Sequence, residues 1–388
     1  MKKICTDAFY GLNYIGFKEK ILVLSMLNNK SLFRYDGVNM QYKTDKVEKR
    51  LSLMFSQDFL LVNNGTSALK LALISNNIGY GDEIIVPCLS FIATATACLN
   101  VGAIPVFAEI DNTFNIDVND IEKKITKKTK AIVVVHFQGF PCDMEKIMML
   151  CKKYNLILIE DVAQSFGTKY KNKYTGTFGD SSAFSFQSSK IITCGEGGGF
   201  TTKKNMDVAK RFADNGGERE FNQMPVWNKK YISYGENLKI TDLESAILDG
   251  QLDKYQKIVK RQEYIYNVLT NKLTGYNIRK EIKDIQAVYL SLSLTFDNEE
   301  ECDNFISYMN KNNIEFHKKI SNYLPSYNTF INSLSPYKNN YPYNNYKVVN
   351  CNKSLNLLQR TAWLNLNSKL SKNDLKYIKQ NLENYKNV

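Results

Sequence analysis

The first half of the chain alternates short apolar runs with segments in which apolar residues recur at helical spacing. The strand-like runs lie at residues 58–62, 83–86, 104–107, 131–137 and 156–160. The helical patterns between them lie at residues 67–73, 91–99, 120–125 and 143–154. Repeated strand and helix units predict an α/β fold, with a mainly parallel sheet flanked by helices on both faces. In such a sheet, ligands bind beyond the carboxyl ends of the strands.

The second half has a different pattern, which predicts a smaller α+β domain. A long helical pattern covers residues 241–273, with Thr241 as its N-cap. The elements expected after it are a strand at 287–296 and helices at 299–311 and 373–385. We therefore predict a large domain over residues 1–250 and a small one over 251–388. Residues 321–346 are rich in Tyr, Asn and Pro, which predicts an extended loop that either covers the site or is only mobile.

Composition indicates a soluble globular protein of ordinary type. The 388 residues are 44% hydrophobic and 23% charged. The formal net charge is +12, but the lysines are scattered along the chain and no basic run or nucleic-acid module stands out. No apolar run approaches the length of a membrane span, and no signal peptide is evident. We expect a cytoplasmic protein with neither a nucleic acid nor a membrane as partner.

Cysteine and histidine give no sign of a metal site. The eight cysteines lack CxxC and metal-finger spacings, which is typical of reduced, mostly buried thiols in the cytosol. His136 and His317 are the only histidines, too few for an imidazole-based metal centre. His136 follows an apolar run, so we expect a hydrogen-bonded histidine at the end of a strand, with a place in the active site as the second interpretation.

An acid at the end of a strand and a lysine before a glycine run are the chemical signature of the sequence. Asp161 ends the run at 156–160, and Lys190 precedes the glycine-rich residues 195–199. Pyridoxal phosphate (PLP) chemistry requires both types: a carboxylate keeps the pyridinium nitrogen protonated, and an amine forms the Schiff base and moves protons. Taken alone, Asp161 is well explained as a helix cap, and Lys190 is better explained as a surface charge. The strand-like residues 183–186 before Lys190 favour the catalytic interpretation, as do the glycines at 195–199, which we expect to form a turn that permits close backbone approach. A structural hairpin is an equal explanation of these glycines.

Gly65, Thr66 and Ser67 lie between a predicted strand and a predicted helix. Such a turn offers unpaired backbone N–H groups and the positive end of the helix dipole to a phosphate. Hydroxyl groups are also common helix caps, and this explanation is the better one for the segment in isolation. Its coincidence with Asp161 and Lys190 makes phosphate binding the stronger hypothesis.

Four short motifs occur in the order found in one enzyme family. They lie at residues 64–69 (NGTSAL), 87–95 (PCLSFIATA), 160–165 (EDVAQS) and 179–180 (GD). With them, the chain from about residue 63 to its C-terminus resembles the DegT/DnrJ/EryC1/StrS sugar aminotransferases. The resemblance implies a PLP-dependent enzyme with the aspartate aminotransferase fold, which is fold type I.

The resemblance also implies roles for individual residues. Lys190 aligns with the lysine that forms the Schiff base with PLP, and Asp161 with the partner of the pyridinium nitrogen. During the implied reaction the cofactor alternates between PLP and its amine form, PMP. Gln164 aligns with the contact to the phenolic oxygen. Thr66 and Ser185 align with phosphate-binding positions. Thr66 lies between Gly65 and Ser67 in the turn described above.

Three further positions follow from the resemblance. Phe91 aligns with an aromatic residue that stacks on the pyridine ring, although a core role is nearly as good an explanation. Asn237 aligns with an asparagine that reaches the cofactor phosphate of the neighbouring subunit, which implies a homodimer with composite active sites. Lys239 stands where the family usually has arginine, and lysine lacks the two-pronged guanidinium.

The implied reaction moves an amino group from L-glutamate or L-glutamine to a keto-sugar, by default a nucleotide-linked keto-deoxyhexose. Residues 31–37 and 194–198 look closest to the branch that aminates inososes and octulosonates, which is the alternative. Arg34 and Tyr35 are candidate substrate contacts, with a surface turn as the alternative. Keto-sugar dehydratases of the family carry histidine in place of the lysine, so Lys190 argues against that activity. Nothing supports a non-catalytic PLP-fold protein.

Overall fold

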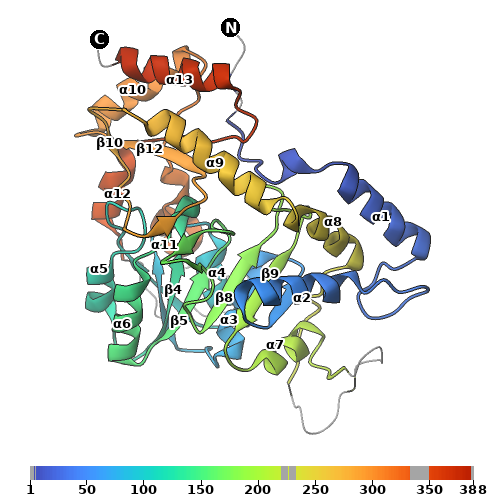
Figure 1. Ribbon diagram of the computed structural model, residues 1–388. Helices are drawn as coiled ribbons and strands as arrows, with labels where there is room; N and C mark the ends of the chain where they lie inside the picture. Colours follow the sequence, from blue (N-terminus) through green and yellow to red (C-terminus); the bar gives the residue numbers. More distant parts are fainter. Residues whose placement is uncertain (1–3, 5, 220–225, 227–232, 333–348, 386–388) are drawn as a thin grey trace.

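A seven-stranded sheet forms the centre of the computed structural model, which describes residues 4, 6–219, 226, 233–332 and 349–385 (Figure 1). Its strands, in spatial order, are β1 (Phe59–Val62), β9 (Gly198–Thr202), β8 (Ser181–Ser185), β5 (Ile157–Asp161), β4 (Thr129–Val135), β2 (Glu83–Pro87) and β3 (Ile104–Ala108). Neighbours from β8 to β3 pair in parallel, whereas β9 is antiparallel to both β1 and β8. The mainly parallel α/β sheet is thus confirmed.

Helices cover both faces of this sheet. They are α2 (Lys43–Phe55), α3 (Gly65–Ser75), α4 (Ala93–Asn100), α5 (Val118–Lys124), α6 (Met144–Tyr154) and α7 (Met206–Ala213). The N-terminal helix α1 (Phe17–Asn29), which follows the 3-10 turn η1 (Leu12–Tyr14), packs instead on α8 (Asp242–Leu252). Alternate residues of β4 belong to different cores: Ala131 and Val133 pack with α3, α4 and α7, and Ile132 and Val134 pack with α5 and α6. Because the two faces of β4 are both apolar, its sequence is a continuous hydrophobic run.

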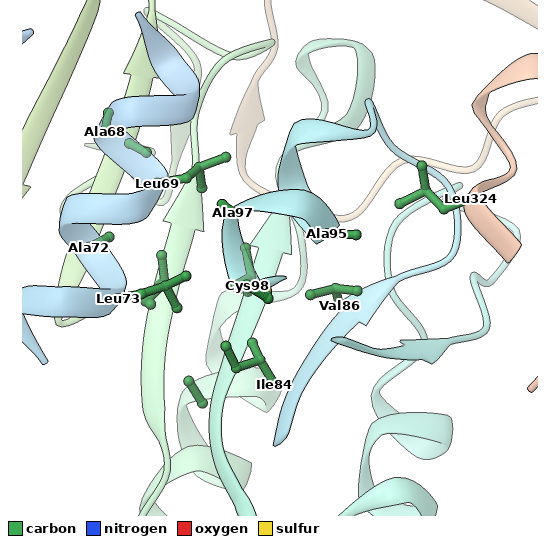
Figure 2. Packing of buried hydrophobic residues seen from close by; sticks show 14 of the residues in the cluster. Ala68, Leu69, Ala72, Leu73, Ile84, Val86, Ala95, Ala97, Cys98 and Leu324 are labelled. Atoms are coloured by element: carbon green, nitrogen blue, oxygen red, sulfur yellow. The ribbon is translucent and has the colours of Figure 1, made fainter. Parts of the chain in front are cut away.

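Small residues let α3 and α4 approach each other above β2 (Figure 2). Ala68 and Ala72 of α3 and Ala95 of α4 are fully buried in one cluster with Ile84 and Val86 of β2. Close packing of this kind holds both helix N-termini firmly at the carboxyl edge of the sheet.

The C-terminal part builds a second, smaller sheet. It contains β10 (Asn277–Ile278), β12 (Ser291–Thr295) and β13 (Thr361–Asn365), which are antiparallel. Helices α9 (Tyr255–Thr270), α10 (Glu299–Lys311) and α13 (Lys372–Tyr385) share its core, and Figure 1 shows α9 running towards it from α8 (Asp242–Leu252). The remaining elements are β6 (Lys169–Tyr170), β7 (Lys173–Tyr174), β11 (Ile285–Gln286), α11 (Asn328–Ile331), α12 (Asn352–Gln359), η2 (Phe137–Gly139), η3 (Ile320–Asn322) and η4 (Leu324–Ser326).

Several predicted boundaries were wrong. The single helix expected at 241–273 is two helices, and the break coincides with Lys254, whose Nζ binds the carbonyl of Tyr14 and the carboxylate of Glu19. The glycine run at 195–199, expected as a turn, already contains the start of β9. Thr241 is confirmed as the cap of α8, since its Oγ1 accepts a hydrogen bond from the N–H of Glu244.

The loop expected at 321–346 contains η4 and α11 in its first part, and residues 333–348 lie outside the described ones. These short helices correct the expectation of a fully extended segment. The boundary predicted at residue 250 falls within α8, and the division into two domains stays a prediction.

The structure also bears on the expectations from composition. The seven described cysteines are free and buried, and Cys5 lies outside the described residues. Within the described ranges, no helix combines the length and the apolar character needed to cross a membrane.

Candidate functional site

A cavity of about 500 Å³ opens at the carboxyl edge of the large sheet. Of the residues predicted from the sequence, those that line it are Gly65, Thr66, Phe91, Asp161, Gln164, Ser185 and Lys190. They come from the end of β5, the end of β8, the start of α3, the segment before α4 and the loop between β8 and β9. The structure therefore gathers in one place residues that span more than a hundred positions of the chain.

Asp161 is the buried acid of this cavity, with 4% of its surface exposed. Its Oδ1 accepts a hydrogen bond from the N–H of Ala163 at 3.1 Å, and its Oδ2 accepts one from Thr94 Oγ1 at 2.9 Å. Thr94 Oγ1 is in turn 2.7 Å from the hydroxyl of Ser90. Burial raises the pKa of Asp161, although these hydrogen bonds and the charge of Lys190 oppose it. A cationic partner at this position would therefore stabilise the carboxylate.

Lys190 lines the same cavity, and its positive charge acts to lower the pKa of Asp161. Within the described part of the chain, its Nζ makes no hydrogen bond or ion pair. Burial lowers the pKa of Lys190, against the opposing charges of Asp161 and Glu196. A lowered pKa increases the share of neutral amine, which is the nucleophilic form. The backbone is held in place, because the Lys190 carbonyl accepts a hydrogen bond from the N–H of Gly11 at 2.8 Å.

The start of α3 carries polar groups that no described residue uses. The helix cap is Asn64, whose Oδ1 accepts a hydrogen bond from the N–H of Ser67 at 2.8 Å, so the explanation of Thr66 and Ser67 as caps was wrong. Among the described residues, the N–H groups of Gly65 and Thr66 and the hydroxyls of Thr66 and Ser185 have no hydrogen-bond partner. Ser67 does not line the cavity.

Two glycines permit this close arrangement. A Cβ on Gly65 would lie 2.9 Å from Ser185 Cβ, which places the Ser185 side chain against the first turn of α3. A Cβ on Gly198 would lie 2.2 Å from the carbonyl oxygen of Asn64. The expectation that the glycine run after Lys190 permits close backbone approach is confirmed.

Gln164 and Phe91 also line the cavity, where one has an amide group and the other an aromatic ring. Gln164 Oε1 accepts a hydrogen bond from the N–H of Gln138 at 2.9 Å, so the amide nitrogen of Gln164 is left to donate elsewhere. Phe91 has 61% of its surface exposed and is not a core residue, which rules out the alternative considered for it. An exposed aromatic ring at a cavity offers a flat face for stacking.

Arg34 and Tyr35 lie outside the lining of this cavity. Arg34 is buried with 4% exposure, and its guanidinium pairs with Glu48 at 2.9 Å. The Tyr35 ring lies between two guanidinium groups, at 4.7 Å from that of Arg34 and 4.2 Å from that of Arg219. Within one chain, these contacts give Arg34 and Tyr35 a structural role instead of direct access to the cavity.

Asn237 is exposed and likewise does not line the cavity. Its backbone forms an antiparallel β-bridge with Asp214. The carboxylate of Asp214 pairs with Arg219 at 2.8 Å and with Lys239. Lys239, the residue that departs from the family pattern, is therefore neutralised within its own chain. Sequence reasoning did not anticipate the Asp214 carboxylate.

Several polar residues of the site were missed by sequence reasoning. Thr94 and Gln138, which hold Asp161 and Gln164, line the cavity, as does Lys319. Thr94 lies inside one of the quoted motifs, and that was the available signal. Gln138 and Lys319 had none. Gln138 adopts a left-handed backbone conformation (φ 54°), which only coordinates can reveal.

His136 is a hydrogen-bonded residue at a strand end, as expected, and does not line the cavity. Its Nε2 lies 3.0 Å from Glu160 Oε2, and its Nδ1 accepts a hydrogen bond from the N–H of Cys142 at 3.1 Å. Since Nδ1 accepts, Nε2 carries the proton and donates to Glu160.

One group of potential metal ligands lies elsewhere in the described residues. Ligand atoms of Cys88, Glu109 and Cys351 lie within 4.8 Å of one another. The carboxylate of Glu109 already accepts a hydrogen bond from the N–H of Ser354 at 2.8 Å, near the start of α12. Glu109 therefore already accepts hydrogen bonds from backbone N–H groups in the first turn of α12.

Comparison with known proteins identifies the family. A GDP-perosamine synthase from Escherichia coli O157:H7 is 41% identical over 254 residues, which cover 63% of this chain and 68% of that protein. A dTDP-3-amino-3,6-dideoxy-alpha-D-galactopyranose transaminase from Aneurinibacillus thermoaerophilus is 43% identical over 194 residues, 49% of this chain and 52% of that one. The putative sugar aminotransferase Spr1654 from Streptococcus pneumoniae, solved in its PMP form, shares the fold.

That structure superposes with a TM-score of 0.81 at 24% identity, over 95% of this chain and 96% of its own. The sequence profile of the DegT/DnrJ/EryC1/StrS aminotransferase family matches residues 32–383. The chain therefore belongs to the DegT/DnrJ/EryC1/StrS aminotransferase family.

Proposed function

We propose that this protein is a PLP-dependent aminotransferase that moves an amino group from L-glutamate or L-glutamine to the ketone of a nucleotide-linked keto-deoxyhexose. The observation that carries the proposal is the cavity lined by both Lys190, whose amine has no partner among the described residues, and Asp161, whose carboxylate is buried. A buried acid and a lysine of lowered pKa in one cavity are what this reaction class needs.

The free groups of the cavity fit the cofactor at each of its ends. Gly65, Thr66 and Ser185 would bind the phosphate, through N–H groups and hydroxyls that have no partner among the described residues. When bound, PLP supplies an aldehyde that condenses with amines and a ring that accepts electrons. Asp161 would hold the ring nitrogen in its protonated form, and the Nζ of Lys190 would move a proton to and from the substrate carbon.

Two other side chains would position the ring. The free amide nitrogen of Gln164 would donate to the phenolic oxygen, since the amide oxygen of Gln164 is held by Gln138. The exposed ring of Phe91 would stack on the pyridine face.

The names of the relatives support a nucleotide-linked sugar as substrate. One is named for GDP-perosamine synthesis and another for a dTDP-linked amino sugar, so both point to amino-sugar biosynthesis. A relative from Bacillus subtilis named as a spore coat polysaccharide biosynthesis protein supports a surface polysaccharide as the destination. The alternative, an inosose or octulosonate ketone, drew on residues 31–37 and 194–198. Arg34 and Tyr35 of the first segment do not line the cavity, whereas Glu196 of the second does, so the preference for a nucleotide-linked sugar rests on the names of the relatives.

A homodimer in the cytoplasm is part of the proposal. The outer face of α1, at the periphery in Figure 1, exposes a row of large apolar residues, namely Phe17, Ile21, Leu24 and Leu27. An exposed apolar stripe of this kind favours association with another protein surface. Asn237, exposed and outside the cavity of its own chain, would reach the phosphate bound by the partner subunit.

The proposal is tested by colour and by turnover. Purified protein incubated with PLP is expected to show the visible absorbance band of a lysine-bound cofactor, and Lys190→Ala to lose that band while keeping its circular dichroism. Lys204→Ala, at an exposed position remote from the cavity lining, is the matched control and should keep the band. A colourless wild type after incubation with PLP contradicts the proposal.

Turnover then identifies the substrates. Keto-sugars linked to GDP, dTDP and UDP, together with inososes, are offered with glutamate or glutamine, and 2-oxo acid formation is measured. Lys190→Ala is expected to be slower by about 10⁴-fold or more, because it loses both the nucleophile and the acid/base group. Activity with inososes alone would transfer the assignment to the alternative substrate.

A further inference from the structure

The cavity contains a second lysine that the proposed chemistry leaves without a task. Lys319, just before η3, lines the cavity with only 8% of its surface exposed. No carboxylate of the described residues pairs with its Nζ, and its one hydrogen bond is a long one to Asn365 Oδ1 at 3.4 Å. The ammonium also lies 5.5 Å from the centre of the Trp363 ring.

The neighbouring lysine has opposite surroundings. Lys318 Nζ pairs with the carboxylates of Glu299 at 2.9 Å and Asp303 at 2.6 Å, on the solvent side of α10. Burial lowers the pKa of Lys319 to about 8 with no acid to oppose it, whereas the pKa of Lys318 is raised, because its two acidic partners outweigh burial. A buried charge is normally paired, because desolvation without a partner is costly. The missing partner of Lys319 is therefore expected to come from a ligand.

We propose that Lys319 binds the carboxylate of the amino donor, and this inference rests on the proposed aminotransferase function. The side chains of Asn322 and Asn365 line the cavity beside it and offer amide donors to the same group. An ammonium with two amides suits a single carboxylate, since it provides one charge and several hydrogen-bond donors.

Two substrates bring anionic oxygen into this cavity: the amino donor its carboxylate, and the sugar nucleotide its diphosphate. The chemistry of the donor favours the carboxylate. In an α-amino acid the carboxylate is attached to the reacting carbon, so a cavity that brings this carbon to Lys190 must also accommodate the carboxylate. In the sugar, the pyranose ring separates the diphosphate from the ketone. Because Lys319 lines the same cavity as Lys190, it is better placed to bind the carboxylate, which lies nearer the reacting carbon than the diphosphate does.

The first test measures binding without turnover. Calorimetry with glutarate, a dicarboxylate that lacks the amine, is performed on PLP-loaded wild type, Lys319→Met, Lys319→Arg and the control Lys318→Met. We expect glutarate to bind about 10-fold or more weaker to Lys319→Met, in line with the loss of a charge-assisted contact. Lys319→Arg should retain most of the affinity, and Lys318→Met all of it. Equal affinity of wild type and Lys319→Met for glutarate overturns the inference.

The second test separates the two anion sources by their half-reactions. The glutamate concentration that half-saturates conversion of the PLP form should rise about 10-fold or more in Lys319→Met, while the half-reaction of the PMP form with the keto-sugar changes little. The reverse pattern assigns Lys319 to the diphosphate and overturns the carboxylate. If Lys319→Met does not fold, Lys319→Gln replaces it. Wild type alone is also informative: it must bind glutarate more tightly than the uncharged glutaramide.

The outcome is separable from that of the proposed function. All Lys319 variants should keep the visible band of the lysine-bound cofactor, because Lys319 contacts neither Lys190 nor Asp161 among the hydrogen bonds and ion pairs of the described residues. A missing band in wild type contradicts the aminotransferase assignment. A normal band with unchanged glutarate binding in Lys319→Met contradicts only the role of Lys319.

Discussion

Glu160 and Asp161 are consecutive carboxylates at the end of β5, and they occupy opposite environments. Glu160 is fully buried, and its two oxygens accept hydrogen bonds from the N–H groups of Gly176, Phe178 and Gly179 at 2.7–2.8 Å and from His136 at 3.0 Å. Asp161 accepts two hydrogen bonds from the described part of the chain and lines the cavity. Since successive side chains of a strand point to opposite faces, one step along the chain exchanges a closed environment for an open one.

The difference appears in the protonation equilibria of the two acids. Burial would raise the pKa of Glu160, but the hydrogen bonds from His136 and from the backbone N–H groups outweigh it, so the pKa is lowered. For Asp161, burial outweighs the hydrogen bonds, and the pKa is raised. The comparison teaches that Glu160 already has all its partners within the fold, whereas Asp161 has room for one more.

Replacing Asp161, the carboxylate that lines the cavity, should have the largest effect of the changes that test this comparison, and the effect is on the rate of transamination. Asp161→Asn keeps the shape of the side chain but removes the charge that would stabilise a protonated ring nitrogen. We expect transamination to slow by about 10³-fold, the magnitude found for loss of an electrostatic contact in an active site. Steady-state rates with the best keto-sugar measure it. Glu160→Gln is the matched control and should keep the rate of the folded protein within a few fold; equal losses in both variants would remove the distinction.

Replacing Glu160, the carboxylate whose partners all lie within the fold, should lower the free energy of unfolding instead. Glu160→Gln turns one acceptor oxygen into an N–H donor facing backbone N–H groups, and it leaves His136 with a weaker partner. We expect a loss of about 3 kcal/mol in the free energy of unfolding, as for breaking a buried charged network. Urea unfolding of the cofactor-free protein measures it, with Asp161→Asn as the control, which should lose less than about 1 kcal/mol. A fully stable Glu160→Gln would show that the network is dispensable.

The two acids should also differ in how stability depends on pH. The folded pKa of Glu160 lies below its unfolded value of about 4.3, so its contribution is present above pH 4.3 and is lost as the pH falls through the folded pKa. The folded pKa of Asp161 is raised, so its ionisation opposes folding above that pKa. Unfolding midpoints of cofactor-free protein between pH 3 and 7 should fall less steeply towards acid in Glu160→Gln than in wild type. In Asp161→Asn the fall should be at least as steep as in wild type.

Local patterns explain what could be predicted from the sequence. The parallel sheet follows from apolar runs of strand length. The motifs contain Asp161 and Gly65, and the local context and the family resemblance indicated Lys190 and Ser185, all of which line one cavity. Each of these signals is complete within a few residues. The cofactor roles of these residues stay predictions.

The features that could not be predicted from the sequence depend on contacts between distant segments of the chain. The carboxylate pairing of Arg34 with Glu48 and of Lys239 with Asp214 depends on tertiary neighbours, so neither could be predicted from a motif. Lys319 is one lysine among many in the sequence, and only the fold shows that it is buried with no carboxylate partner among the described residues. The break between α8 and α9 coincides with contacts from Lys254 to the N-terminal segment, which a local helical pattern cannot reveal.

The smallest effect concerns the hydroxyl that holds Asp161 in place. Thr94→Val removes the hydrogen bond from Thr94 Oγ1 to Asp161 Oδ2 with little change in volume. Because this bond stabilises the charged carboxylate, we expect the pKa of Asp161 to rise further and transamination to slow by roughly fivefold, about 1 kcal/mol. Thr96→Val on the same helix is the control, since the Thr96 hydroxyl donates to the carbonyl of Ile92 and not to the site. An effect of Thr94→Val no larger than that of Thr96→Val would mean that Asp161 is positioned by β5 and the Ala163 N–H alone.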